Sequence, residues 1–473
     1  MQKGNTYLLL DSRIVNKTEN LQLKPVEAAK CKQNPLFAED MFADPPRRWE
    51  ARFDNFYPNV IYDEEEKLYK LWYNSFIRDR SSETTPLESR STASYDTGGR
   101  EDGLLYAVSK DGLVWEKPSL GIVSFDGDTG NNIVMSTKTH GIHGVGVIKD
   151  LADPDLERRY KAFYRHADTK KMATGYSRDG LHWSEPADWP DYNALGDTHN
   201  NVIRIAGTDT FVGITRGLSG ESPNRYRTVM RTTSTDFVNW SDPLQVLAGN
   251  SIEDQIYSIP IHQYKNVYIG LPAIYHGGDK NAENWDLVDT ELAWSSDTIT
   301  WNRICPGTPV IPRGRGTYPS GAYDCGCIYA AAPVVVDDSI YLYYGGSNGL
   351  HTSFRETFFC LAILPRDRFA GYSPIDPGGR GILHTNQFRI SDDFLKINTD
   401  AAEGSLSVAL MNDEGRIIDG CSHEDCTIQQ HGSIEKQVSW SRSLSTIKGQ
   451  KVSFQIQLGS LPVFALSGQI TSV

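Results

Sequence analysis

Short apolar stretches rich in Val, Ile and Tyr recur along the first three quarters of the chain, and each is broken by Asp, Gly or Asn. Alternating or continuous apolar runs bounded by such turn residues are typical of β-strands joined in hairpins. Five strand–turn–strand segments follow this pattern, at residues 59–76, 145–166, 200–217, 257–276 and 332–349. The pattern therefore predicts one antiparallel hairpin in each of five successive regions.

A second hairpin follows in these regions, and its turn carries a repeated phrase. The phrase reads SKDGLVW at 109–115 and SRDGLHW at 177–183, with partial copies at 234–240 and 295–301. Its Ser and Asp side chains can bond backbone N–H groups two residues on, and its Gly accepts the positive φ of a tight turn. We interpret the phrase as structural, with its Trp packing beside the hairpin.

The spacing of this phrase predicts the fold. Its final Trp recurs about every 60 residues, which is too long for one rung of a solenoid. Four strands in each of five units match a five-bladed β-propeller. We therefore predict an all-β chain with a five-bladed β-propeller catalytic domain over residues 1–374. Within it, residues 1–50 form an irregular N-terminal segment, and the stretch 6–15 adds a strand to the propeller.

The repeat stops at a Pro- and Gly-rich linker, SPIDPGGRG, at 373–381. Shorter alternating segments separated by turn residues follow it. This pattern is typical of antiparallel strands in a β-sandwich. We predict that residues 375–473 form a separate C-terminal β-sandwich domain.

Composition narrows the range of partners. With 60 acidic and 47 basic residues the net charge is −13, which disfavours nucleic acid and anionic membranes as partners. No run of eighteen apolar residues occurs, so we expect no membrane partner. No apolar leader opens the sequence, which favours a cytoplasmic location but leaves export of a mature form open.

Polar residues gather just ahead of the first strand of each repeat. If that strand is the innermost of its blade, these residues meet on one rim of the central channel, because innermost strands run in the same direction along the axis. We predict that the catalytic carboxylates are Asp54, Glu253, Asp254 and Asp324. We predict that the substrate-binding residues are Arg52, Asn55, Tyr57, His143, Asp197, His199, Gln255, Tyr257 and Tyr329.

Several carboxylates on one rim point to glycosidic bond cleavage. Carboxylates in a partly dry pocket cannot all ionise freely, so their pKa values separate. One then protonates the leaving oxygen while another acts as base or nucleophile. We assign the base or nucleophile to Asp54, the acid to Glu253 or Asp254, and a third carboxylate to Asp324. His143 and His199 would bind substrate hydroxyls or tune a carboxylate.

With these features the chain resembles the superfamily of invertases, levansucrases and arabinanases, which are five-bladed propellers with acidic residues at the inner rim. The predicted C-terminal sandwich makes glycoside hydrolase family 32 the nearest resemblance. The resemblance implies a glycosidase that acts on an oligo- or polysaccharide. The segment DNFYPNV at 54–60 departs from the Asn-Asp-Pro-Asn-Gly pattern of the invertases, so the roles above are not carried over from that family.

Other classes of protein fit the same residues. One is a metal-dependent carbohydrate lyase or hydrolase, since histidines and carboxylates on one rim could hold a divalent cation. Another is a non-catalytic carbohydrate-binding propeller, since a fold does not settle function. A sialidase would need an arginine cluster for its substrate carboxylate. Candidates for that cluster are Arg52, Arg165, Arg216 and Arg355. We expect no cofactor and no metal site, apart from a structural or axial cation such as Ca²⁺.

Overall fold

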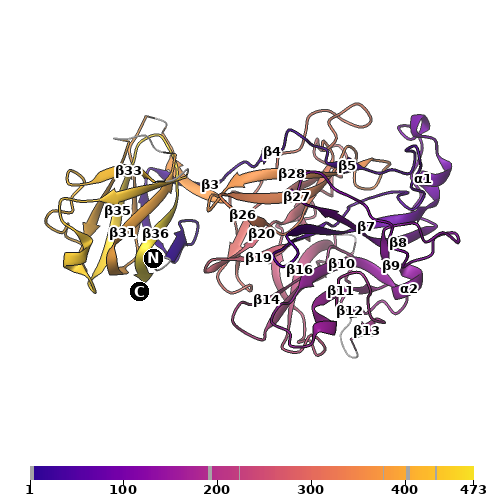
Figure 1. Ribbon diagram of the computed structural model, residues 1–473. Coiled ribbons are helices and arrows are strands. Elements are labelled where there is room, and N and C mark those ends of the chain that lie inside the picture. The colour runs from indigo at the N-terminus through magenta and orange to yellow at the C-terminus, as the bar shows by residue number, and fades with distance from the viewer. Residues whose placement is uncertain (1–4, 190–193, 223, 377, 401–404, 432–433) are drawn as a thin grey trace.

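The protein has a larger and a smaller lobe, both built almost entirely of β-strands (Figure 1). The computed structural model describes residues 5–189, 194–222, 224–376, 378–400, 405–431 and 434–473. The helices described are short: α1 (Arg80–Thr84), α2 (Thr137–His140) and the 3₁₀ turns η1 (Leu87–Ser89), η2 (Leu156–Arg158) and η3 (Leu444–Ile447). None of the helices in these ranges is long and apolar enough to cross a membrane.

Four antiparallel sheets of four strands each make up most of the larger lobe. The first two contain β6 (Asn59–Asp63), β7 (Leu68–Asp79), β8 (Arg100–Ser109), β9 (Ile133–Ser136), and β10 (Ile142–Lys149), β11 (Tyr160–His166), β12 (Met172–Ser177), β13 (Ala187–Asp188). The other two contain β14 (Asn201–Arg204), β15 (Phe211–Ser219), β16 (Tyr226–Ser234), β17 (Leu244–Ala248), and β19 (Ile261–Tyr264), β20 (Val267–Gly270), β23 (Ala293–Ser295), β24 (Trp301–Arg303). Their first strands contact one another in chain order, which gives a propeller-like arrangement.

The remaining strands of the larger lobe belong to one nine-stranded sheet rather than to a fifth separate sheet. Its main path is β18 (Gln255–Ser258), β21 (Ala273–Tyr275), β22 (Val288–Thr290), β25 (Cys327–Ala330), β27 (Ser339–Ser347), β28 (Thr357–Pro365) and β4 (Ala29–Lys30). At its side, β26 (Val334–Val336) pairs with β27, and β5 (Phe37–Ala38) pairs with β28. The described chain therefore has four separate four-stranded sheets, where the sequence predicted five blades.

Prolines mark the points at which the strands of the fourth and fifth repeats are interrupted. Pro260 separates β18 from β19, Pro272 separates β20 from β21, and Pro333 separates β25 from β26. Proline has no backbone N–H to donate to a ladder, so a strand ends there. The segments β18, β21, β22 and β25 pair with one another on one side of these breaks, and Val288 of β22 joins Cys327 of β25 in a parallel bridge.

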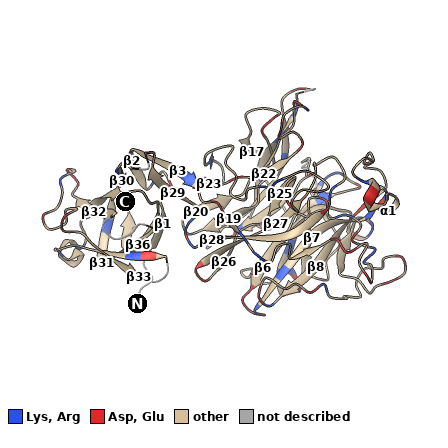
Figure 2. Ribbon diagram, turned by 90° about the horizontal axis from the view of Figure 1, so that it is seen from above, with Lys and Arg blue, Asp and Glu red and all other residues tan. Residues whose placement is uncertain are grey.

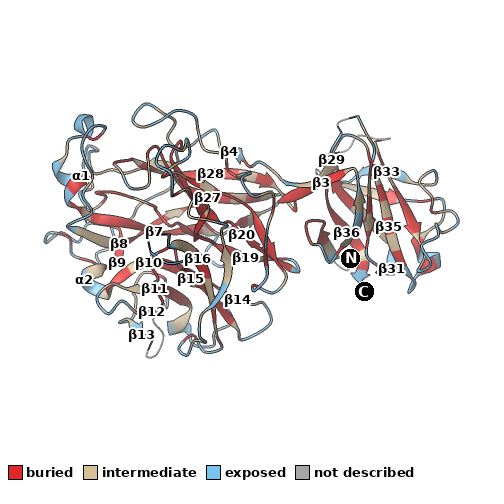
Figure 3. Ribbon diagram, turned by 180° about the vertical axis from the view of Figure 1, so that it is seen from behind, coloured by how far each residue is buried: buried red, intermediate tan, exposed pale blue. Residues whose placement is uncertain are grey.

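A cavity of about 390 Å³ lies between the inner strands of the larger lobe. Its wall comes from β6, β10, β14 and β19, and on the fifth side from Val334 and Val335 of β26. The buried residues follow the strands of both lobes, while the connecting loops are mainly exposed (Figure 3). Charged residues are dispersed over both lobes (Figure 2).

The smaller lobe joins both ends of the described chain in one sheet of eleven strands. They are β1 (Asn5–Leu8), β2 (Val15–Glu19), β3 (Leu21–Pro25), β29 (Ala370–Pro374), β30 (Gly381–Thr385), β31 (Phe388–Thr399), β32 (Leu406–Met411), β33 (Thr427–His431), β34 (Glu435–Ser439), β35 (Lys451–Leu458) and β36 (Val463–Ser472). Because strand pairing connects all eleven, a C-terminal sandwich of two separate sheets is not confirmed.

The N-terminal strands belong to this lobe and not to the propeller-like part. β1 pairs with β36 and β2 pairs with β30. The prediction that residues 6–15 add a strand to the propeller is therefore wrong. The physical reason is burial, because Leu9 and Ile14 are packed into the core of the smaller lobe together with Leu383 and Leu466.

The repeated phrase forms the same turn in all four copies. In the first, the Ser109 hydroxyl donates to Asp111 Oδ1 at 3.0 Å, and that oxygen accepts two backbone N–H groups of the turn. Gly112 has a φ of 77°, and in the partial copies Phe237 and Thr298 hold the same place with φ values of 62° and 64°. The Ser and Asp side chains of the repeated phrase therefore stabilise the hairpin turn, which is a structural role.

Candidate active site

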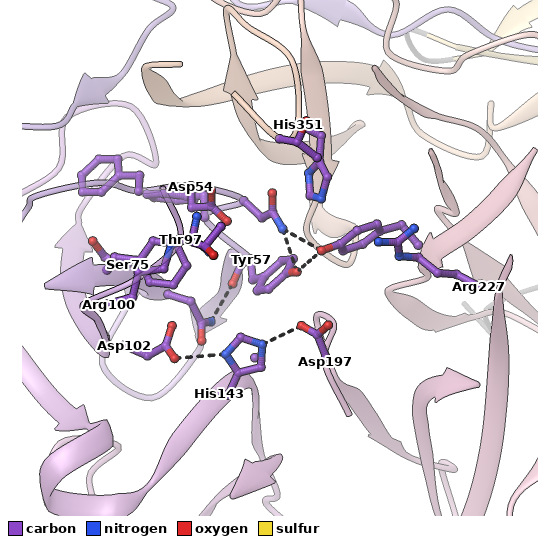
Figure 4. A pocket seen from close by; sticks show the side chains of 18 residues that line it. Asp54, Tyr57, Ser75, Thr97, Arg100, Asp102, His143, Asp197, Arg227 and His351 are labelled. Atoms are coloured by element: carbon purple, nitrogen blue, oxygen red, sulfur yellow. Dashed lines mark hydrogen bonds and ion pairs between the residues drawn. The ribbon is translucent and has the colours of Figure 1, made fainter. Parts of the chain in front are cut away.

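A second cavity, of about 230 Å³, opens where the loops ahead of the inner strands of repeats one to three converge (Figure 4). The polar side chains on its wall are Asp54, Asn55, Tyr57, Asn74, Ser75, Thr97, Arg100, Asp102, His143, Asp197, Arg227, Tyr257, His351 and Thr352. Asp54 precedes β6, His143 lies on β10, and Asp197 precedes β14. The rim predicted from the sequence therefore exists for these three repeats.

Asp54 lines the cavity, and only one of its two carboxylate oxygens accepts hydrogen bonds from the described residues. Its Oδ1 accepts hydrogen bonds from Arg52 Nε and Arg355 Nη2, both at 3.0 Å. Both arginines are almost completely buried, at 1% exposure each. Oδ2 has no hydrogen-bond partner within the described ranges, and the side chain is 18% exposed. One oxygen of Asp54 is thus available to a bound molecule.

The charge of Asp54 is fixed by its neighbours. Burial raises the pKa of this carboxyl, but the positive charges of Arg355 and Arg52 outweigh burial and hold the pKa well below its usual range. Asp54 is therefore ionised at neutral pH. In this state it can accept a proton or attack an electrophilic carbon, but it cannot donate a proton.

The backbone around Asp54 is strained. Asp54, Phe56 and Tyr57 have φ values of 51°, 63° and 40°, in the left-handed region that non-glycine residues avoid. Each such residue costs about 1–3 kcal/mol unless its surroundings impose the conformation. Here they do: Phe56 is fully buried and stacks on Tyr73 at 4.8 Å, and the Thr357 hydroxyl donates to the Asp54 carbonyl at 2.8 Å. Tertiary packing, and not local preference, places Asp54.

On the other side of the cavity, His143 bridges two carboxylates. Its Nδ1 lies 3.0 Å from Asp102 Oδ2 and its Nε2 lies 2.9 Å from Asp197 Oδ1. Burial lowers the pKa of His143, but the two carboxylates overcome this effect and raise it to about 10. His143 is therefore an imidazolium at neutral pH, donating a hydrogen bond to each carboxylate. Arg216 Nη1 adds a further donor to Asp197, at 2.9 Å.

Gly144 allows this network to form. Its φ is 62°, and a Cβ at this position would lie 1.8 Å from the carbonyl oxygen of Thr198. That carbonyl belongs to the loop that carries Asp197. The side chain of Asn200 also donates to the Gly144 carbonyl, at 2.8 Å. Only glycine permits this approach, which brings His143 within reach of Asp197.

A group of neutral hydroxyls and amides forms the base of the cavity. Asn55 Nδ2 donates to the hydroxyls of Tyr57 and Tyr257, at 2.8 and 3.2 Å, and its Oδ1 accepts from Arg355 at 2.6 Å. Burial raises the pKa of Tyr57 well above its usual value, so this hydroxyl stays protonated. Such groups suit the hydroxyls of a sugar, which both donate and accept hydrogen bonds.

His351 completes the wall from the loop after β27. Its Nδ1 receives the Tyr329 hydroxyl at 3.0 Å and faces Arg355 Nη1 at 3.4 Å. Two donors on Nδ1 leave the ring proton on Nε2. Burial first, and then the charge of Arg355, lower the pKa of His351 well below its usual value. A neutral Nε2–H donor is therefore presented at the cavity.

Three of the predicted catalytic carboxylates do not reach this cavity. Glu253 is exposed in the turn before β18, and Asp254 is bound to Arg303 at 2.7 Å. Asp324 is buried, at 1% exposure, and is paired with Lys30 at 2.6 Å. They precede β18 and β25, which end before Pro260 and Pro333 and do not line the axial cavity. Their placement gives no support to a catalytic role.

Four of the predicted substrate-binding residues stand behind the wall rather than on it: Arg52, His199, Gln255 and Tyr329. His199 stacks on Tyr57 with ring centroids 5.3 Å apart, and burial lowers its pKa to about 3. It is therefore a neutral support for Tyr57. The remaining five, Asn55, Tyr57, His143, Asp197 and Tyr257, line the cavity.

Four charged or titratable wall residues were not predicted from the sequence: Arg100, Asp102, Arg227 and His351. Arg100 and Asp102 open β8, the third strand of its sheet, and Arg227 lies on β16, also a third strand. The prediction considered only residues ahead of inner strands. A signal was present in β8, where Arg-Glu-Asp precedes an otherwise apolar strand.

A cation site was one of the alternatives for the rim. The described ranges contain no cluster of three or more His, Cys, Asp or Glu side chains suited to hold a metal ion.

Comparisons with known proteins give only distant similarity. No family model matches the chain, and no curated protein matches it. A glycosyl hydrolase from Bacteroides ovatus is similar at 15% identity and a TM-score of 0.44, over 74% of this chain and 97% of that one. A structure from the GH130 family of mannoside phosphorylases, which contains glycoside hydrolases that target β-1,2 mannosidic linkages in Candida mannan, has 14% identity and a TM-score of 0.46 over 72% and 94%.

An N-acetylgalactosamine deacetylase from F. plautii, in complex with blood group B trisaccharide, has 13% identity and a TM-score of 0.44 over 74% of this chain and 97% of that one. All three similarities are below 25% identity and a TM-score of 0.5. We therefore infer function from the cavity itself.

Proposed function

We propose that the protein is a glycoside hydrolase that cleaves a glycosidic bond of an oligo- or polysaccharide in the cavity around Asp54. The observation that carries this proposal is the state of Asp54, an ionised carboxylate with Oδ1 held by two buried arginines and Oδ2 open at the cavity. Glycoside hydrolysis requires a carboxylate of this kind as base or nucleophile.

The second requirement is a proton for the leaving oxygen. Asp197 is held ionised by His143 and Arg216, since their charges outweigh the effect of burial on its pKa. The proton that lies between His143 Nε2 and Asp197 Oδ1 is the one available on this side of the cavity. In this proposal the proton passes from His143 Nε2 to Asp197 and from there to the leaving oxygen, which leaves His143 neutral and Asp197 ionised. The Asp197 side chain is 55% exposed at the cavity, so a bound sugar can contact it. The ionised carboxylate and the proton are therefore both supplied by side chains of the cavity wall.

Sugar hydroxyls would be bound by the neutral groups of the wall, Asn55, Tyr57, Tyr257 and His351. These hydroxyls and amides are positioned by one another rather than by solvent, so they lose little freedom when a substrate binds. A cavity of about 230 Å³ lies below the roughly 300–1,000 Å³ that is usual for ligand sites. Its size suits one terminal sugar residue better than an internal segment of a chain.

The proposal also includes the number of blades in the larger lobe. We infer that β26, β27, β28 and β4 are the fifth blade of a five-bladed propeller. They pair in this order within the nine-stranded sheet. The axial cavity supports this assignment, because β26 lines it beside the inner strands of the four separate sheets.

The test is a screen of aryl glycosides and natural oligosaccharides with the full chain and with Asp54→Asn. Asp413→Asn, an exposed carboxylate of the smaller lobe, is the matched control. We expect turnover of at least one substrate, its loss in Asp54→Asn, and its retention in the control, with all three proteins folded by circular dichroism. Binding of a sugar without turnover by any protein would instead identify a carbohydrate-binding propeller.

A second measurement separates nucleophile from base. Asp54→Gly is incubated with azide and the sugar product is analysed. If Asp54 is the nucleophile, azide attacks in its place and the product has the anomeric configuration opposite to that of the substrate. If Asp54 activates water, the native enzyme itself releases a product of inverted configuration, which proton NMR detects during the reaction.

A further inference from the structure

Two arginines of the cavity wall, Arg100 and Arg227, form no ion pair with a carboxylate within the described ranges. The three buried arginines behind the wall differ from them, since each one pairs with Asp54 or Asp197. The charges of Arg100 and Arg227 act on Asp54 and Asp197, but neither guanidinium touches a carboxylate. A guanidinium at a cavity without a contact partner can bind an anion there.

Arg100 has its own hydrogen-bond acceptor. Its Nε and Nη2 both donate to the Tyr95 hydroxyl, at 2.9 and 2.5 Å. The guanidinium also lies over the rings of Phe76 and Tyr95, with its central carbon 4.5 and 4.9 Å from the ring centroids. The Nε–Nη2 edge, which is the edge that binds a carboxylate with two hydrogen bonds, is therefore occupied.

Arg227 differs from Arg100 in the part of the guanidinium that is hydrogen-bonded. Its Nη1 donates to Gln255 Oε1 at 2.9 Å, and its guanidinium packs against Tyr257 and Tyr275, with its central carbon 5.1 and 4.7 Å from the ring centroids. Its Nε and Nη2 make no hydrogen bond to the described residues, and neither atom is sealed inside the protein. The edge that binds carboxylates is thus unoccupied on a side chain that is already fixed in place.

We propose that Arg227 binds the carboxylate of an acidic sugar, so that the substrate class is a uronic-acid-containing oligosaccharide. The proposal rests on the function proposed above and specifies its substrate. The planar Nε–Nη2 edge matches a carboxylate with two parallel N–H···O bonds. Because Gln255 and the two tyrosines already hold the side chain, little rotamer entropy is lost on binding.

The other charges of the cavity favour a singly charged anion. Asp54, Asp102 and Asp197 line the same small space and would repel a doubly charged phosphate more strongly than a carboxylate. His351 and Arg227 also lie close enough for the charge of Arg227 to lower the pKa of His351 further. A bound carboxylate would neutralise that charge and leave His351 Nε2–H to donate to a neighbouring hydroxyl.

The test measures binding with matched pairs of ligands. Oligosaccharides of galacturonic, glucuronic and mannuronic acid are compared with the same oligosaccharides after reduction of each carboxylate to an alcohol. Isothermal titration uses the full chain carrying Asp54→Asn, so that no ligand is consumed. We expect at least one acidic ligand to bind roughly 10- to 100-fold more tightly than its reduced form, as for a charge-assisted hydrogen-bond pair.

Variants of Arg227 then test its role. Arg227→Gln is expected to abolish the difference within the pair, and Arg227→Lys to keep part of it, because lysine retains the charge but not the paired donors. Arg225→Gln, at an exposed residue outside the cavity, is the matched control for loss of one positive charge and is expected to keep the full difference. Melting temperatures report whether each variant is folded.

Several outcomes would overturn the proposal: equal binding of acidic and reduced ligands, failure of every acidic ligand to bind, a difference that survives Arg227→Gln, or tighter binding of inorganic phosphate than of any uronide. Turnover of neutral sugars with no acidic preference would leave the glycosidase function standing and remove only Arg227's role. Uronide binding that depends on Arg227, without turnover by the unsubstituted protein, would support the role of Arg227 and contradict the glycosidase function.

Discussion

Asp54 and Asp324 make a useful comparison. Each is a carboxylate ahead of a strand, in the first and fifth repeats, and each is paired with cations. Asp54 is held by two arginines but keeps 18% of its side chain exposed at a cavity, whereas Asp324 is 1% exposed and paired with Lys30. Asp54 precedes β6, which lines the axial cavity, while Asp324 precedes β25, which ends before Pro333 and does not line it. Of these two carboxylates, only the one ahead of the strand that lines the axial cavity reaches the candidate site.

The largest expected difference between the two carboxylates is in catalysis. Asp54→Asn removes the proposed base or nucleophile and should lower kcat by roughly 10²–10⁴-fold. Asp324→Asn should change kcat by no more than a few-fold, because the residue does not reach the cavity. Steady-state kinetics on any substrate found in the screen measures both. Equal losses in the two folded variants would contradict the comparison.

For the free energy of unfolding we expect the opposite order, with Asp324→Asn more destabilising than Asp54→Asn. Asp324→Asn leaves Lys30 without its partner, and removing one member of a buried ion pair costs about 3–5 kcal/mol. Lys30 is 27% exposed and can turn toward water, so we expect a loss of about 1–3 kcal/mol in the free energy of unfolding. Urea denaturation measures it, with Lys30→Met together with Asp324→Asn as the control in which no charge is left unpaired. A double variant as unstable as the single one would argue against the ion pair as the cause.

The arginines of Asp54 should determine the acidic limb of the pH profile. Their charges hold the pKa of Asp54 well below its usual range, so Arg355→Gln should raise that pKa. The carboxylate would then become protonated at higher pH, and the acidic limb of kcat/KM should move upward by about one pH unit, equivalent to about 1.4 kcal/mol. Arg303→Gln, which removes the partner of Asp254 outside the cavity, should leave the limb in place. A shift in both variants would indicate a general charge effect.

An effect of similar size is expected from His143 on stability at high pH. The pKa of His143 is raised from 6.5 to about 10 in the folded state, so its stabilising contribution is fully present below pH 6.5 and is lost as the pH rises through about 10. We expect a loss of roughly 1–2 kcal/mol over this window, since the partly exposed Asp197 is screened by solvent. His143→Gln should remove this pH dependence, and the exposed His182→Gln should retain it. Urea denaturation across the window gives the comparison.

The hairpins, and the gathering of polar residues from repeats one to three at one cavity, could be predicted from the sequence, because both depend on local features. Turn residues and apolar alternation mark a hairpin within about 20 residues, and Asp54, His143 and Asp197 follow from their positions at inner strands. The proline breaks were overlooked because a strand that resumes after one proline has the same apolar pattern as an unbroken strand.

What could not be predicted depends on pairing between distant segments. Nothing local distinguishes the stretch around Leu9 as a partner of β36 rather than of a propeller strand, because both partners would bury the same side chain. Arg227 and His351 reach the cavity from β16 and from the loop after β27, through packing that no local pattern encodes. The open edge of Arg227 depends in turn on Gln255, which was predicted for a different role.

The pairing of β1 with β36 has a consequence for synthesis of the chain. Asn5–Leu8 lie against residues 465–468, so the strand that leaves the ribosome early waits for nearly the whole described chain before its partner exists. In that interval the four-stranded sheets, whose strands are neighbours in sequence, can fold while the apolar residues of β1 to β3 remain exposed. The smaller lobe can therefore complete its sheet only late in synthesis. Until then its exposed apolar strands make the nascent protein most prone to aggregation.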